Sequence, residues 1–169
     1  MSNITQGNFK VLQVNRQAVN SVLSSLLIGT VIFSVIIIYF RFESMPVLIL
    51  GFFWVVDLVF TLYVHFQYLK RNKGGKYCIG TNEVSWIQDG VQVSKKKSDI
   101  QSIGLYQTGA IERNSSFFIL SFEPYYYFKF KFQDEEELVL TCLLDKDLKK
   151  MIQDSFEILE YRCFYPEIK

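Results

Sequence analysis

Histidine is almost absent from this sequence, which has a single one, His65, inside an apolar run. A serine or cysteine nucleophile needs a neighbouring base, most often histidine. The residues that follow the apolar run therefore cannot assemble a Ser-His or Cys-His pair. A glycine-rich loop leading into a helix, which would cradle phosphate groups, is missing as well. These absences predict that the chain is not an enzyme and uses no cofactor.

Cysteine is also scarce, and its spacing excludes two common stabilising devices. The three cysteines, Cys78, Cys142 and Cys163, are odd in number, far apart in sequence and without a histidine nearby. They fit neither a disulfide framework nor a zinc site, so we expect no bound metal and free thiols in a reducing compartment. The net charge of +1 gives no sign of nucleic-acid binding.

Charge is missing from a long stretch near the start of the chain. Residues 22–40 contain no charged side chain, and a helix of that length matches a hydrocarbon core about 30 Å thick. No small-residue cleavage site follows this run, so we expect a retained span rather than a signal peptide. A second run begins at Pro46, a residue that suits the first turn of a helix, and predicts a span at 46–66. The short connection allows only an antiparallel hairpin, at 22–68 overall.

Basic residues are unevenly placed around the two spans. Arg41 alone lies between them. The others nearby precede the first span or follow the second: Lys10, Arg16, Lys70, Arg71, Lys73 and Lys76. By the positive-inside rule, both termini of a multi-pass protein of the cell (inner) membrane are cytoplasmic. The lipid bilayer is thus the first predicted partner, with a cytoplasmic N-terminal segment at 1–21.

Asp57 is the one acidic residue within the second span. A charged carboxylate near the bilayer centre costs at least ~2.5 kcal/mol and is usually paired or functional. On a helical projection Asp57 shares a polar stripe with Thr61 and His65. Small residues that favour close helix packing recur in the first span, at Ser21, Ser25 and Gly29. We favour a hydrogen bond from Asp57 across a helix interface, within the hairpin or in a homo-oligomer; a proton or ion relay to His65 is the alternative.

Turn residues divide the region 73–169 into short runs rich in β-branched and aromatic residues. The clearest run alternates Phe128, Phe130 and Phe132 with Lys129 and Lys131, which predicts one buried and one wet face. Six further runs have strand character, at 76–80, 83–88, 91–95, 100–107, 117–122 and 138–143. We therefore predict about seven strands connected by hairpins, in a cytoplasmic domain.

The last part of the chain changes from a strand period to a helix period. Leu148, Ile152 and Leu159 share one face of a helix expected at 145–160, with Asp145 or Asp147 near its exposed amides. The predicted fold class is therefore an α+β membrane protein. It combines a two-helix transmembrane hairpin with a seven-stranded antiparallel β-sandwich or barrel that a C-terminal helix caps.

Seven antiparallel strands and one C-terminal helix resemble the pleckstrin-homology (PH) superfold, in which the helix plugs one end of a bent sandwich. The hairpin, a basic tether at 70–76, the stretch 77–84 (YCIGTNEV), a turn at Gly90 and the stretch 98–103 (SDIQSI) resemble bacterial membrane proteins with a PH-like domain. This resemblance implies a PH-like fold at 73–169 and a membrane topology. It transfers no catalytic residue.

Two basic clusters are the candidates for binding a lipid or a partner. They are Lys70, Arg71 and Lys73 on the tether, and Lys95, Lys96 and Lys97 at the end of a strand. Near a membrane, each lysine adds about 1 kcal/mol toward anionic lipid headgroups. The alternative for the second cluster is a solvated hairpin edge, since the arginine pattern that accompanies inositol phosphate binding in eukaryotic PH domains is absent.

The function predicted from these features is a non-enzymatic, membrane-anchored binding or scaffold module. It would present its PH-like domain to a protein, to a second copy or to lipid headgroups. Two alternatives stay open. One is an oligomeric membrane sensor or ion-conducting element that uses Asp57, and the other is an accessory subunit of a larger membrane complex.

Overall fold

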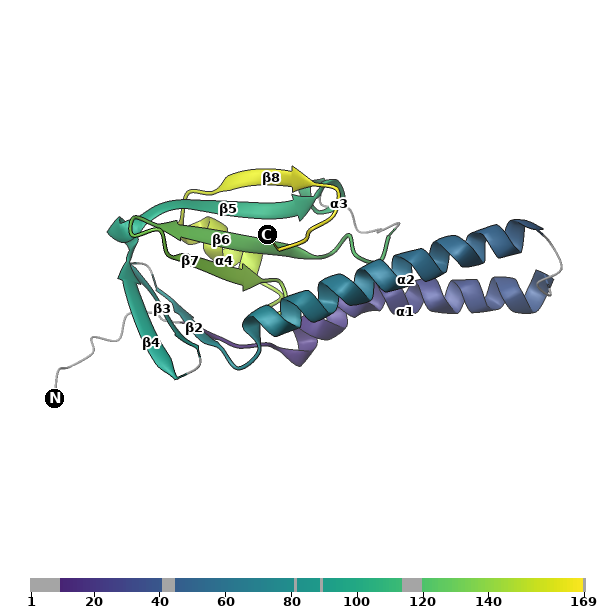
Figure 1. Ribbon diagram of the computed structural model, residues 1–169, viewed down its shortest axis with the longest axis horizontal. Helices are drawn as coiled ribbons and strands as arrows, with labels where there is room; N and C mark the ends of the chain where they lie inside the picture. The colour runs from purple at the N-terminus through teal and green to yellow at the C-terminus, as the bar shows by residue number, and fades with distance from the viewer. Residues whose placement is uncertain (1–9, 41–44, 81, 89, 114–119, 169) are drawn as a thin grey trace.

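The computed structural model describes residues 10–40, 45–80, 82–88, 90–113 and 120–168. In chain order the elements are β1 (Lys10–Leu12), α1 (Arg16–Phe40), α2 (Met45–Asn72), β2 (Lys76–Ile79), β3 (Glu83–Gln88), β4 (Val91–Lys96), the 3-10 turn η1 (Lys97–Asp99), β5 (Ile100–Thr108), α3 (Gly109–Glu112), β6 (Tyr126–Phe132), β7 (Glu137–Thr141), α4 (Leu148–Ser155) and β8 (Leu159–Cys163). The two long helices lie side by side and project from one end of the sheets (Figure 1).

The helices α1 and α2 form an antiparallel hairpin where the sequence places its two spans. The ring of Phe33 stacks on Trp54 with 5.1 Å between centroids. This packing depends on Gly51, where an added Cβ would lie 3.1 Å from the Phe33 ring. A glycine here lets the two helices approach closely, as small residues do in membrane helix pairs.

Both helices extend beyond the limits that the apolar runs suggest. The first begins at Arg16 instead of 22, and the second continues to Asn72 instead of 66. The flexible tether expected at 70–76 is therefore reduced to 73–75, because Lys70 and Arg71 belong to the last turn of α2. Hydropathy marks where a helix is apolar, whereas the polar ends of these helices are held by the sheets.

The first strand comes from the N-terminal segment and lies beside β2, so the hairpin is inserted between two neighbouring strands. Lys10 pairs with Ile79 and Leu12 with Tyr77, in antiparallel register. The first sheet thus has the order β1-β2-β3-β4. The N-terminal segment expected at 1–21 therefore contributes the strand β1 to this sheet. Its three residues are too few to carry a recognisable strand pattern.

The second sheet has the order β7-β6-β5-β8, with β6 in a central position. Phe128 pairs with Leu105 on one side and Leu140 on the other, and all three side chains are fully buried. Phe130 and Phe132 are buried on the same strand, as the alternating pattern predicts. The opposite face is drier than expected, because the Tyr127 ring stacks on Tyr106 with 4.7 Å between centroids.

The structure differs from the expected arrangement at two places in this sheet. Its last strand, β8, runs parallel to β5, so the sheet is not wholly antiparallel. The strand expected at 117–122 lies partly outside the described residues, and 120–122 form a bend and turn. The part of the chain that the structure describes holds eight strands, among them β1 and β8, which the sequence patterns do not indicate.

The C-terminal helix is shorter than the predicted 145–160. It ends at Ser155, where the Lys97 ammonium donates a 2.6 Å hydrogen bond to the Ser155 carbonyl oxygen. Phe156 then adopts an extended conformation and packs edge-on against Phe130, with centroids 5.9 Å apart. The chain then forms β8, which begins at Leu159 and pairs with the open edge of β5. The unpaired backbone groups of that edge are satisfied by β8, which would not happen if the helix continued.

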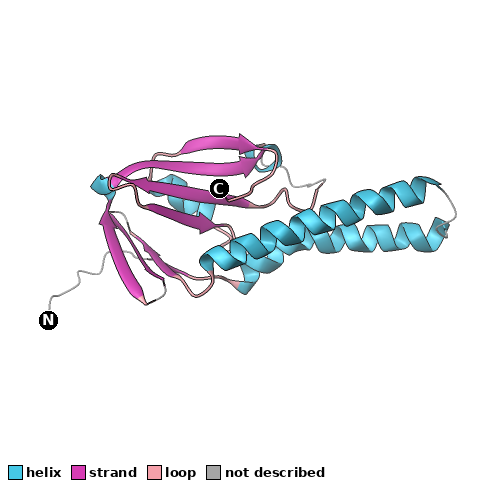
Figure 2. Cartoon of the chain, viewed as in Figure 1, coloured by secondary structure: helices cyan, strands magenta, loops and turns pink. Residues whose placement is uncertain are grey.

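The core lies where the two sheets and α4 meet (Figure 2). Trp86 of the first sheet stacks on Phe132 of the second at 5.6 Å. Leu148 and Ile152 on the inner face of α4 are completely buried. The amphipathic period therefore correctly predicts a helix that packs on the core, although α4 is shorter than the predicted 145–160.

Candidate functional site

The hairpin carries most of the exposed apolar surface of the described chain. Its outward residues include Leu27, Ile28, Val31, Ile32, Val35, Ile38, Leu48, Ile49, Phe52, Phe53, Val55 and Val59, each at least 49% exposed. By length and composition, both helices are able to cross a membrane. Soluble monomers rarely expose a contiguous apolar surface of this extent, so the hairpin marks an interaction surface.

Asp57 contacts the sheet domain rather than the other helix. Its two carboxylate oxygens accept the backbone N–H of Ser121 at 3.0 and 3.2 Å. The Ser25 hydroxyl of α1 donates to the Ser121 carbonyl at 3.1 Å, and Gly29 lies beside the Ser121 side chain. The small-residue face of α1, expected to meet a neighbouring helix, therefore receives this loop. We call the contact of Asp57 and Ser25 with Ser121 the hairpin latch.

The rest of the polar stripe on α2 faces the sheets as well. The His65 ring nitrogen Nδ1 lies 2.9 Å from the Tyr125 hydroxyl, and Tyr68 donates 2.7 Å to the Pro166 carbonyl. Thr61 is buried, and its hydroxyl has no hydrogen-bond partner among the described residues. The stripe thus faces the domain against which the helix docks, where Asp57 and His65 contact different partners.

Replacing Asp57 with leucine should loosen the latch while the hairpin remains helical. The Ser121 amide would lose its acceptor, and an unsatisfied buried amide costs about 1–3 kcal/mol. We expect hydrogen exchange of residues 120–125 to quicken by about tenfold or more, because local opening becomes easier. Mass spectrometry of the exchanged protein measures this rate. Val59→Leu, an exposed apolar change on the same helix, should leave it unaltered, and equal protection in Asp57→Leu would contradict the assignment.

Asn72 connects the end of α2 to β7, although the sequence offers no sign of this role. Its side-chain amide donates to the Val139 carbonyl and to the Tyr77 hydroxyl, both at 3.0 Å. Its carbonyl oxygen accepts the Thr141 amide at 3.1 Å. The side chain is completely buried. In the sequence it stands among lysines and arginine, where an asparagine is most often exposed.

The lysine cluster 95–97 is occupied by partners within the molecule. Lys95 forms ion pairs with Asp134 and with Glu136, the latter at 2.9 Å. Hydrogen bonds to these carboxylates raise the Lys95 pKa, and the Lys95 hydrogen bond lowers the Asp134 pKa. Lys97 caps α4, with its ammonium 4.9 Å from the Phe156 ring centroid. Lys96 is exposed and forms no ion pair with another described residue. The strand β4, which ends at Lys96, lies at the end of the sheets away from the hairpin tip (Figure 1).

The basic residues at the end of α2 remain exposed. Lys70 and Arg71 line a surface cavity of about 250 Å³ together with Gln67 and Ile168. Lys73 follows the helix and is exposed too. This cluster lies at the sheet end of the hairpin, on the same side as β2, and not at the hairpin tip (Figure 1).

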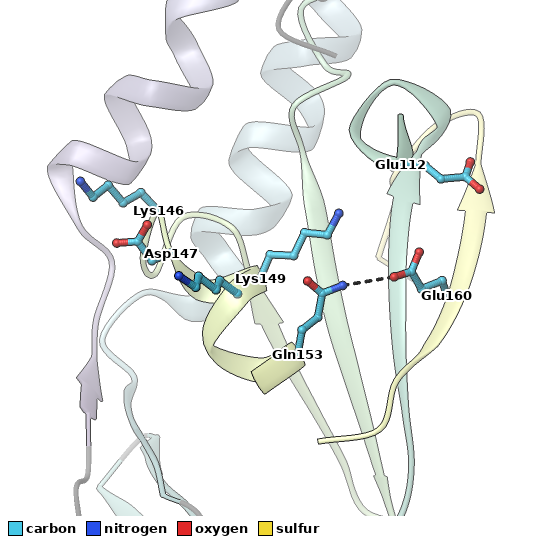
Figure 3. A pocket seen from close by; sticks show the side chains of 7 residues that line it. Glu112, Lys146, Asp147, Lys149, Gln153 and Glu160 are labelled. Carbon is cyan, nitrogen blue, oxygen red and sulfur yellow. Dashed lines mark hydrogen bonds between the residues drawn. The ribbon is translucent and has the colours of Figure 1, made fainter. Parts of the chain in front are cut away.

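A charged cavity of about 380 Å³ lies between α4 and β8 (Figure 3). Glu160 accepts hydrogen bonds from Gln153 at 3.2 Å and from Gln107 at 2.9 Å, while Lys149 donates to Gln107. The lining of this cavity carries both signs of charge, together with the neutral Gln153: Glu112, Lys146, Asp147, Lys149, Lys150 and Glu160. Because several of these groups satisfy one another, the cavity does not form a cradle for one anion. In the described ranges, no cluster of three metal-ligating side chains occurs.

Two sheets packed against a helix at the end of the domain agree with the PH-like architecture expected from the sequence. The profile of the PH domain family matches residues 9–150. The chain belongs to the PH domain family. The match starts just before β1 and ends within α4, so the hairpin lies inside the matched region and β8 lies after it. No curated protein and no solved structure matches the chain.

PH-like domains are generally binding or scaffold modules without catalysis, and their usual ligands are proteins and lipid headgroups. The family and the architecture therefore support a binding role for this chain. They agree with the sequence in two respects, a mixed α+β fold and two apolar helices long enough to span a membrane.

Proposed function

We propose that this protein is a membrane-anchored PH-like module whose hairpin enters the lipid bilayer and whose sheets present a binding surface on the cytoplasmic side. The observation that carries the proposal is the uncovered apolar surface of α1 and α2. A bilayer is the covering that suits it best, because the exposed side chains lie on both helices toward one tip. Helices are also the structures that satisfy their own backbone hydrogen bonds in hydrocarbon.

The charge distribution supports the proposed orientation. Pairing of β1 with β2 puts Lys10 at the same end of the hairpin as Lys76. Arg16, Lys70 and Arg71 lie at that end too, since they occupy the sheet-side ends of α1 and α2. The positive-inside rule favours the cytoplasmic side for this end, and this supports a cytoplasmic position of both termini and of the PH-like domain in an inner-membrane protein.

Membrane anchoring is tested by placing carboxylates on the exposed apolar surface of both helices. Val35 and Phe53 are 60% and 63% exposed, and an aspartate at the centre of a span costs about 2.5–3.5 kcal/mol on insertion scales. We expect Val35→Asp combined with Phe53→Asp to release the protein from membranes during alkaline carbonate extraction, or to prevent its accumulation there.

The matched control is Val91→Asp, which makes the same change at a side chain 62% exposed on β4. This variant should stay in the membrane fraction like the unaltered protein. A doubly substituted hairpin that remains as resistant to carbonate as the control would overturn the proposal.

A further inference from the structure

The hairpin latch lies within the apolar surface of the hairpin and not at its edge. On α2 the exposed apolar side chains extend from Met45 to Phe66, a rise of about 32 Å that matches a hydrocarbon core about 30 Å thick. Asp57 lies about 13 Å from the sheet-side end of this stretch. On α1 the charge-free run begins at Val22, before Ser25. A bilayer that covers both apolar stretches therefore extends past the latch toward the sheets.

The chain just before β6 lies beside α2 (Figure 1). The Tyr125 hydroxyl lies 2.9 Å from the His65 ring. Ser121 contacts Asp57 instead, about 12 Å farther along the helix toward the hairpin tip. We call residues 120–124, which form a bend and turn, the latch turn. The latch turn therefore reaches the level of the span at which Asp57 lies.

Side chains of the hairpin satisfy both backbone polar groups of Ser121. The N–H donates to the Asp57 carboxylate, and the carbonyl accepts the Ser25 hydroxyl. Hydrocarbon offers no hydrogen bonds, so irregular backbone at membrane depth is tolerated only where the protein satisfies it. Two polar side chains on otherwise apolar stretches of helix thus meet this requirement for one residue of the sheet domain.

Other backbone groups of the latch turn are satisfied close by. The Leu120 amide donates to the Glu123 carboxylate, and the Leu120 carbonyl accepts the Glu123 amide, both at 3.1 Å. The Phe122 carbonyl accepts the Tyr125 amide at 3.1 Å. The Thr108 hydroxyl donates to the Glu123 carbonyl at 2.8 Å. Because these groups are already paired, moving them out of water costs much less than it would for free groups.

Phe164 adds an apolar side chain beside the latch turn. It is 84% exposed, the largest value among the exposed large apolar side chains of the described chain. Its ring meets Phe122 edge-on, with 6.2 Å between centroids. The next residue, Tyr165, donates a 3.0 Å hydrogen bond to the carbonyl of Phe60 on α2, and the Phe60 side chain is exposed too. The apolar surface of the hairpin thus continues onto the sheet domain.

Two arginines near the latch turn can keep their charge in water. Arg113 and Arg162 line a cavity of about 390 Å³ together with Phe122 and Phe164. Arg113 follows α3 and Arg162 lies on β8, so both belong to the sheet domain. The Arg162 side chain is 66% exposed, and an arginine has a long apolar stem that lets its guanidinium reach the membrane surface. These charges are therefore compatible with entry of the turn into the outer part of one leaflet.

We propose that the latch turn is a third membrane-embedded element of this chain. It enters the hydrocarbon beside the hairpin, with Phe164 against the acyl chains, and Asp57 and Ser25 hold it there. Because α3 precedes the turn and β6 follows it, both in the sheet domain, the element is re-entrant and does not cross the bilayer. This inference rests on the proposed membrane anchoring, and it gives the carboxylate inside the second span a structural role.

The test measures the surroundings of spin labels on the full chain in nanodiscs of phosphatidylcholine and phosphatidylglycerol. Cys78→Ser and Cys163→Ser remove two native thiols, and Cys142 needs no replacement, because burial raises the pKa of its thiol to about 12. Labels are attached one at a time, at four exposed apolar positions: Phe164→Cys, Val59→Cys, Phe66→Cys and Val91→Cys.

Access of oxygen, which favours hydrocarbon, and of a soluble nickel complex gives the depth of each label. We expect the label at 59 to be the deepest and the label at 66 to lie near the surface, since both are on the span. The label at 91, on β4, should be fully aqueous. The label at 164 should lie at a depth between those at 59 and 66.

The role of the latch is tested with two substitutions of Asp57. Asp57→Leu removes the acceptor of the Ser121 amide, so we expect the turn to leave the lipid and nickel access at 164 to rise severalfold. Asp57→Asn keeps a side-chain oxygen that accepts this amide, and it should leave the label at 164 in place. The label at 59 should stay unaltered in both variants.

The outcomes separate the turn from the anchor. A label at 164 that is as aqueous as the one at 91, or shielded from both reagents by protein, would refute the embedded turn while a lipid-exposed label at 59 upheld the anchor. Aqueous labels at both 59 and 66 would refute the anchor itself. An equal response at 164 to leucine and asparagine, or no response to leucine, would contradict the role of the Asp57 hydrogen bond.

Discussion

Asn72→Leu should destabilise the folded protein by about 3–5 kcal/mol, since it removes three buried hydrogen bonds, and the loss for the Val139 carbonyl and the Thr141 amide alone costs about 1–3 kcal/mol each. The leucine fits the volume but leaves the Val139 carbonyl, the Thr141 amide and the Tyr77 hydroxyl without this partner. All three groups belong to strands, so the change acts on the junction between α2 and the sheets. Loss of this junction should also free the end of α2.

Urea unfolding in detergent micelles measures this effect, followed by the fluorescence of Trp86 in a Trp54→Phe background. Trp86 is a suitable reporter because it stacks on Phe132 between the two sheets. Lys73→Leu is the matched control, a polar-to-leucine change at the adjacent exposed residue, and it should shift stability by less than about 0.5 kcal/mol. A loss below about 1 kcal/mol in Asn72→Leu would mean that water replaces the lost bonds.

The local features of the fold could be predicted from the sequence. A charge-free run and a strand that alternates phenylalanine with lysine depend only on neighbouring residues, and α1, α2 and β6 lie where these patterns predict them. The strand β1 could not be predicted, because it has three residues and pairs with β2 beyond the whole hairpin. The parallel strand β8 could not be predicted for a related reason. Leu159 continues the helical period of the sequence, whereas in the structure it pairs with the distant strand β5.

In the candidate site too, some features could be predicted from the local sequence and others depend on contacts between distant residues. Asp57 stands out in an apolar run, so its importance could be inferred, but its partner is a backbone amide 64 residues away. The lysines 95–97 attract attention in the sequence, whereas the acidic turn that neutralises Lys95 comes from a distant hairpin. Arg113 and Arg162 are single basic residues in unrelated segments. Only the fold places them at one cavity beside the hairpin.

Phe128→Ala should cost about 3–5 kcal/mol, the range for removing a fully buried phenylalanine. The site has little room to relax, because Phe128 lies on the central strand β6 between the fully buried side chains Leu105 and Leu140. The ring of Tyr126 also packs edge-on against it, with centroids 6.0 Å apart. Urea unfolding measures the loss. Lys131→Ala, an exposed change on the same strand, should stay within about 0.5 kcal/mol of the parent.

The same variant separates folding of the sheets from anchoring by the hairpin. Because α1 and α2 satisfy their own backbone hydrogen bonds, a hairpin in lipid does not need the sheets to remain inserted. Phe128→Ala should therefore lose its sheet structure at low urea and still resist carbonate extraction, whereas Val35→Asp with Phe53→Asp should be released while its sheets stay folded. Release of Phe128→Ala from the membrane upon unfolding would instead mean that the latch and the sheets hold the hairpin in place.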